Sequence, residues 1–98
     1  MGHGYVRTLE SIKDAVAIGP GKVLAGDEFH DLTVQVEGIT IATVDVEVSN
    51  DGATWYSDPA VTPLTADGIE ELTPGYKYYR ANMTAWTSGT VTATIHGK

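Results

Sequence analysis

The sequence contains no cysteine and few basic residues, and both absences limit what the chain can do. Without cysteine there is no disulfide, no thiol nucleophile and no thiolate ligand for a metal. Six lysines and arginines stand against thirteen aspartates and glutamates, which gives a formal net charge of −7. Because nucleic-acid binding depends on basic side chains that neutralise phosphates, we expect no nucleic-acid partner.

Long apolar runs are missing as well. No stretch approaches the roughly 20 apolar residues that are needed to span a bilayer. The amino-terminal sequence MGHGYVRTLES lacks the apolar segment of a secretory signal peptide. We therefore expect no membrane partner and no export by the general secretory route.

Motifs that organise catalysis or metal binding are also absent. No Gly-x-Ser-x-Gly elbow is present, and the acidic pairs Asp27-Glu28 and Glu70-Glu71 would point to opposite faces of a strand. No pair of histidines has the spacing of a metal site, since they stand at His3, His30 and His96. The sequence predicts a protein that is not an enzyme and needs no cofactor or metal, although weak calcium binding at Asp-Gly turns stays open.

What the sequence does contain is alternation of apolar and polar residues with the period of a β-strand. Residues 32–37 and 41–49 alternate on either side of Glu37-Gly38-Ile39-Thr40, which predicts a hairpin connection. Residues 76–86 and 90–96 alternate around Thr87-Ser88-Gly89, which predicts a second hairpin.

The remaining segments are less regular. Prolines at 59 and 63 confine residues 55–64 to an edge strand, and residues 65–75 contain two turn dipeptides and are expected to form a loop. Gly19-Pro20-Gly21 favours two short strands before residue 26, and residues 1–11 are left as an N-terminal arm. We therefore predict an all-β protein: residues 12–98 form a single antiparallel β-sandwich or jelly-roll-like barrel of about seven strands.

The stretch VEVSNDGATWYSD, residues 46–58, predicts a strand, a turn and a second strand. Asn50-Asp51-Gly52 supplies the turn, and Trp55 supplies a large apolar surface that anchors the sheet. Four aromatic residues allow two interpretations, an exposed platform for sugar rings or a contact with the core or another subunit: Trp55, Tyr76, Tyr78 and Trp86. We favour the second interpretation.

Three segments, LTVQVEG, ATVDVEVSNDGATW and GYKYYRANMTAWTSGTVTATI, together resemble small β-sandwich virion structural proteins of tailed bacteriophages, in particular capsid decoration or cement proteins. The resemblance covers about residues 14–95 and rests on pattern. SNDGATW also resembles part of the Asp-box of sialidase propellers, but one shortened copy does not support a propeller. Similar hairpins occur in longer, discoidin-like sandwiches that bind carbohydrate or lipid.

The resemblance to decoration proteins implies a non-enzymatic protein that binds the outer capsid surface and stabilises contacts between major capsid subunits. It implies a virion location, with the host cytoplasm before assembly, and a homo-oligomer in which a trimer is favoured. The residues expected to contact a partner are Tyr5, Arg7, Tyr78, Arg80 and Trp86. A phage tail or head-tail connector protein and a carbohydrate-binding β-sandwich module remain as alternatives.

Overall fold

The computed structural model describes residues 6–26 and 28–98, and this part of the chain forms seven strands and no helix. The strands are β1 (Arg7–Ala15), β2 (Gly19–Pro20), β3 (Leu24–Ala25), β4 (Leu32–Ser49), β5 (Tyr56–Ser57), β6 (Gly68–Glu71) and β7 (Tyr78–Gly97). All pairings are antiparallel. The predicted class, all-β and antiparallel with about seven strands, is confirmed, and the sheet is not closed into a barrel because β1 and β5 end its path.

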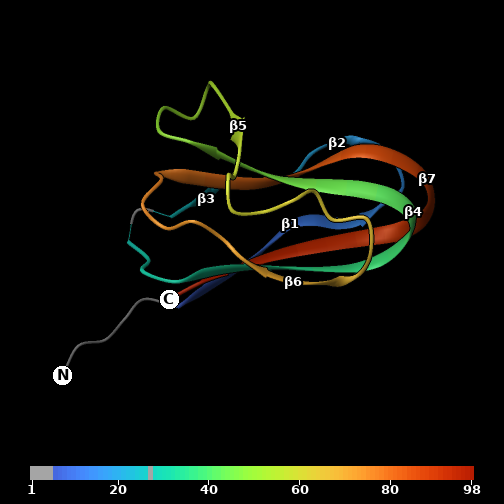
Figure 1. Ribbon diagram of the computed structural model, residues 1–98, viewed down its shortest axis with the longest axis horizontal. Helices are drawn as coiled ribbons and strands as arrows, with labels where there is room; N and C mark the ends of the chain where they lie inside the picture. Colours follow the sequence, from blue (N-terminus) through green and yellow to red (C-terminus); the bar gives the residue numbers. More distant parts are fainter. Residues whose placement is uncertain (1–5, 27) are drawn as a thin grey trace.

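Two long strands organise the molecule. β4 has 18 residues and β7 has 20, and they pair from Leu32 opposite Gly97 to Ser49 opposite Tyr78. Both strands bend together near their middles, so that their halves lie over one another as two layers (Figure 1). One layer adds β1 and β6 to these strands, and the other adds β2, β3 and β5. The sandwich is therefore one sheet folded over.

The two predicted hairpins at Glu37–Thr40 and Thr87–Gly89 are wrong, because β4 and β7 each continue through these positions. The register of the pair shifts several times between Glu37 and Val44, which marks bulges that bend the sheet. Gly38 has φ +84° and Gly89 has φ +112°, and a Cβ on Gly38 would overlap the carbonyl oxygen of Thr90. The glycines thus permit a bend where the sequence predicted turns.

The core lies between the two layers and is formed by the inward-facing residues of both halves of each long strand. Burying apolar surface stabilises a fold by roughly 25 cal/mol per Å². The most deeply buried apolar residues of the long strands are Val34, Val36, Val44, Val46, Tyr79, Ala81, Met83, Val91, Ala93 and Ile95. Since the first and second halves share one core, the bend is what allows each half to bury its apolar face.

The sheet begins earlier than the expected boundary between the arm and the domain. Residues 7–10 pair with residues 97–94 of β7, and Leu9 packs against the core. Residues 7–11 therefore belong to β1. In an edge strand, polar residues can face solvent while the alternate residues pack against the core. The rest of the expected arm, residues 1–5, lies outside the described residues.

Two weaker predictions had different outcomes. The segment after Trp55 does form an edge, since β5 ends the path of the sheet and Leu64 adds an isolated bridge to Val44. Residues 65–75 were expected to form a loop, but Gly68–Glu71 pairs with β4 as β6. β6 is short and mostly exposed, and no alternation of the usual kind marked it in the sequence.

Candidate functional site

The residues expected to bind a partner do not gather in one site. Arg7 is exposed at the start of β1, opposite Gly97. Tyr78 and Arg80 lie in the other layer on β7, where they pair with Ser49 and Glu47 of β4, and Trp86 lies at the bend. Tyr5 lies outside the described residues. Of the set, Tyr78 and Arg80 lie two residues apart on β7, and Trp86 lies further along the same strand.

The Arg80 guanidinium is engaged within the chain. Its Nε donates to Glu47 Oε1 at 2.8 Å, and its Cζ lies 4.2 Å from the centroid of the Trp55 ring. Asn82 Nδ2 donates to the second oxygen of Glu47 at 3.2 Å. The Glu47 and Arg80 side chains are only 16% and 21% exposed, so water screens this pair less than it screens a surface pair. Arg80 therefore links the half-buried Trp55 to β4 and β7.

Trp86 is fixed at the bend. Its ring packs against the core, and its Nε1 donates to the carbonyl oxygen of Gly89 at 2.9 Å. Trp55 is covered in part by Arg80, so these two tryptophans and Tyr78 do not form a row of exposed rings. The aromatic platform considered from the sequence is thus not assembled from Trp55, Tyr78 and Trp86.

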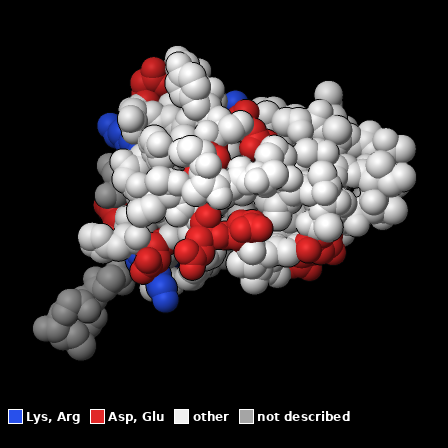
Figure 2. Space-filling model, in the orientation of Figure 1, with Lys and Arg blue, Asp and Glu red and all other residues white. Residues whose placement is uncertain are grey.

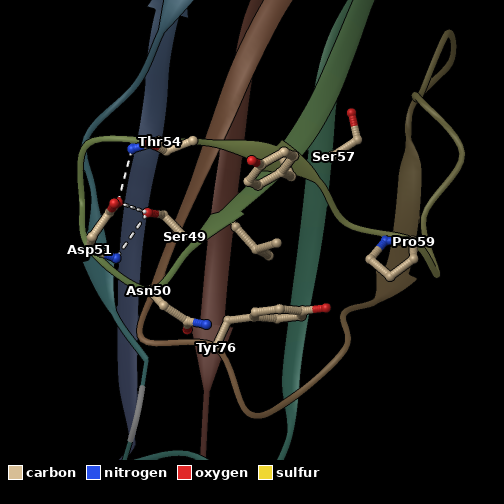
Figure 3. Close-up of a pocket in the computed structure, with 9 residues that line it drawn as sticks. Ser49, Asn50, Asp51, Thr54, Ser57, Pro59 and Tyr76 are labelled. Atoms are coloured by element: carbon tan, nitrogen blue, oxygen red, sulfur yellow. Dashed lines mark hydrogen bonds between the residues drawn. The ribbon is translucent and has the colours of Figure 1, made fainter.

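The predicted turn at Asn50-Asp51-Gly52 is present and is held by side-chain hydrogen bonds. Asp51 Oδ1 accepts from the backbone N–H of Thr54 at 2.8 Å and from Ser49 Oγ at 2.9 Å (Figure 3). It also accepts from the backbone N–H of Ala53 at 2.9 Å. Ser49 Oγ in turn accepts from the N–H of Gly52. The backbone donors of Thr54 and Ala53, with Ser49, lower the pKa of Asp51 to about 2.

A groove of about 580 Å³ opens beside this turn (Figure 3). Tyr56 and Tyr76 border it, and the lining is completed by Val48, Ser49, Asn50, Asp51, Thr54, Ser57 and Pro59. Tyr56 is 69% exposed, whereas Tyr76 packs edge-on against Tyr79 with ring centroids 6.3 Å apart. Aromatic walls with a polar rim can hold a small polar ligand such as a sugar ring.

Tyr56 is a groove residue that sequence reasoning missed, although Tyr76 was among the aromatic candidates. The alternation at Val46 and Val48 predicts a strand. Tyr56, by contrast, lies in an irregular segment that contains prolines, where no pattern predicts the direction of a side chain. The pairing of Tyr56 with Val48 in β5 decides where its ring lies. No periodicity in a two-residue strand could indicate that position.

Two buried aspartates support the loops around the groove. Asp58 is 2% exposed, and its carboxylate accepts from Ala60 N, Thr73 N and Thr73 Oγ1. Asp45 Oδ2 accepts from Ser57 Oγ, while its Oδ1 is buried and has no hydrogen-bond partner among the described residues. Asp58 therefore ties the segment after β5 to the segment after β6.

Within residues 6–26 and 28–98, no three histidine, aspartate or glutamate side chains are placed so that they could hold a metal ion. The same part of the chain contains no helix with the length and apolarity of a membrane span.

The geometry defines an all-β protein whose single sheet folds into two layers, with an aromatic groove at one edge. No family model matches the sequence, and no curated protein matches it. Among solved structures, the chain is similar to the crystal structure of SPBc2 prophage-derived protein YomS, with a TM-score of 0.77 and 10% sequence identity. The similarity covers 100% of this chain and 97% of that chain. At this identity, the likeness establishes a shared fold.

Proposed function

We propose that this chain is a non-enzymatic structural protein of a bacteriophage particle, of the capsid decoration type. The observation that carries the proposal is the full-length likeness in fold to a protein described as prophage-derived. In this role the chain binds the outer capsid surface and stabilises contacts between major capsid subunits by adding buried interface. It is in the host cytoplasm before assembly and on the virion afterwards, and its partners are the major capsid protein and other copies of itself, with a trimer favoured.

Its architecture suits such a role. A folded sheet with one shared core is a pre-ordered body, so binding loses little conformational entropy in the strands. Tyr78 is the first residue of β7, two residues before Arg80, and it is partly exposed. Tyrosine is enriched where interfaces gain most of their energy. We therefore assign Tyr78 to capsid contact and Arg80 to positioning the neighbouring Trp55.

Undecorated capsids, prepared without this chain, provide the test. Purified chain should co-sediment with them to a saturating ratio, and microscopy of the particles should show its density on the shell. Tyr78→Ala should weaken binding by about thirtyfold, the equivalent of a hot spot of about 2 kcal/mol. Ile69→Ala, an exposed residue in the other layer, is the matched control and should bind as wild type does.

Two results would contradict the proposal. Density for the chain in the tail or at the head-tail connection would favour the connector alternative. Failure of the wild-type chain to bind capsids at all would remove the decoration role.

A carbohydrate-binding module is a second candidate, and the groove between Tyr56 and Tyr76 favours it. An exposed ring such as Tyr56, with a second aromatic ring and polar side chains nearby, is typical of sites that hold sugar rings. A titration with neutral oligosaccharides, monitored by tyrosine and tryptophan fluorescence, tests this function. Binding that Tyr56→Ala abolishes would support it, and no response to any glycan would remove it.

A further inference from the structure

One end of the molecule is made from segments without charged residues. Residues 38–44 of β4 and 83–91 of β7 meet at the bend and contain no aspartate, glutamate, lysine or arginine. The same is true of residues 15–21, which cross from β1 to β2. Figure 2 shows the bend end, at the right, as uncharged, while the acidic side chains gather over the rest of that face.

This uncharged end exposes large aliphatic side chains. Ile41, at the tip of the bend opposite Ser88, is 60% exposed. Val16 and Ile18, in the crossing from β1 to β2, are 55% and 65% exposed. The crossing flanks the bend, because the residues at its two ends, Ala15 and Gly19, pair with Val91 and Met83 on either side of the β7 bend. Exposed apolar side chains that share one end of a molecule can form an interaction site.

We propose that copies of this chain associate with one another through this uncharged end, which we define by Val16, Ile18, Ile41 and the residues of the β4 and β7 bends. The inference extends the homo-oligomer in the proposed function, but it does not depend on capsid binding. Two or three copies can meet end to end, with their bodies pointing outward.

The distribution of charge favours a second copy as the partner. Each chain carries a formal charge of −7, so contacts through most other surfaces would bring acidic side chains together. Contact through the uncharged end buries aliphatic groups and directs the acidic bodies away from one another along the 45 Å axis of the molecule. Asp67, at the margin of this end, already accepts the N–H groups of Gly38 and Ile39.

The size of the end predicts a contact of modest strength. The two shorter dimensions of the molecule are 28 and 20 Å, so the end can bury at most on the order of 560 Å² on each partner. About 1,100 Å² in total is near the lower limit of roughly 1,000 Å² for a specific interface. The bend is also pre-ordered, since Trp86 is hydrogen-bonded to Gly89 within it. We expect association in the micromolar range.

Salt gives this contact a distinctive property. Dissolved ions screen repulsion between the acidic bodies, while the interface itself contains no charge pair that screening would weaken. Association should therefore strengthen as the salt concentration rises. An interface held by ion pairs would respond in the opposite direction.

Sedimentation velocity of the purified full chain, from low to high micromolar concentration, tests the proposal. The wild type should form dimers or trimers, and Ile41→Lys should weaken association at least about tenfold, or ~1.4 kcal/mol. Ile69→Lys is the matched control, because Ile69 is 65% exposed on β6 next to Glu70 and should leave association unchanged. Ile18→Lys provides a second variant at the proposed surface, and thermal melts establish that each variant is folded.

A wild-type chain that stays monomeric at high micromolar concentration would overturn the inference. So would equal effects of Ile41→Lys and Ile69→Lys, or an association that weakens with salt. These experiments use no capsid, so a failure here is separate from a failure of the decoration role.

Discussion

Single carboxylates hold the loops of this protein to its sheet. The Asp51 carboxylate accepts hydrogen bonds from Ser49, Ala53 and Thr54. The Asp58 carboxylate accepts hydrogen bonds from Ala60 and Thr73. Backbone N–H groups in loops lack strand partners, and a carboxylate with two oxygens can satisfy several of them. Part of the acidic composition therefore has a local structural role, apart from any effect on partners.

Asp51 gives a prediction about pH at this scale. Its pKa is lowered to about 2 in the folded chain, so its ionised form is favoured by folding. In the unfolded chain the pKa of an aspartate is about 4. The stability that Asp51 contributes should therefore be fully present above about pH 4 and be lost as the pH falls through about 2. The difference in melting temperature between wild type and Asp51→Asn should therefore be larger at pH 6 than at pH 2. Melts across this range measure it, and a difference independent of pH would contradict the assignment.

The bend of β4 and β7 is the element that determines the architecture. At the bend, register shifts in β4 coincide with glycines of positive φ in both strands, Gly38 and Gly89. A bulge adds a residue to one strand and increases the local bend and twist. Because both strands bend at the same place, one sheet covers its own apolar face, and the core forms without a second sheet.

Gly38→Ala should be strongly destabilising for this reason. Alanine at φ +84° is strained, and its Cβ would overlap the carbonyl oxygen of Thr90 on the paired strand. We expect a loss of about 2 kcal/mol or more in the free energy of unfolding, measured by urea denaturation. Gly68→Ala is the control, since a Cβ there meets nothing within 4 Å and the residue has no positive φ. Equal losses for the two variants would show that the bend does not require Gly38.

At the scale of the whole molecule, β1 completes one layer of the folded sheet. Its pairing with the second half of β7 runs from Arg7 to Ala15, and Leu9 and Ile12 contribute to the core. Ser11 also connects the layers, because its Oγ donates to Lys22 O and accepts from Ala81 N. The N-terminal residues from Arg7 onward are thus part of the folded body.

Removal of residues 1–10 should therefore destabilise the fold. The truncation deletes the pairs of residues 7–10 with β7 and the packing of Leu9, which together should be worth about 2 kcal/mol or more. Chemical denaturation of the truncated chain measures the loss. Removal of residues 1–5 is the comparison, since it leaves every described pair of β1 in place. An unchanged free energy of unfolding after removal of residues 1–10 would contradict the pairing.

The sequence by itself determined the local structure of this protein. Alternation in residues 32–37, 41–49 and 90–96 predicted strands because a half-buried strand has a period of two, and that relation is local. Asn50-Asp51-Gly52 predicted a turn because its residues favour turn conformations wherever they stand.

Only the tertiary structure decided how these strands are joined and what they bring together. An alternating run that is interrupted by glycine fits either two strands joined by a turn or one strand with a bulge. The position of the partner strand decides between them, and the partner strand passes Gly38 at Thr90. Tyr56 and Tyr76 both line the groove. Ile18 and Ile41 both lie at the uncharged end, because the segments that contain them pair with β7 on either side of it. Both surfaces are made by residues distant in sequence, and sequence periodicity carries no information about such neighbours.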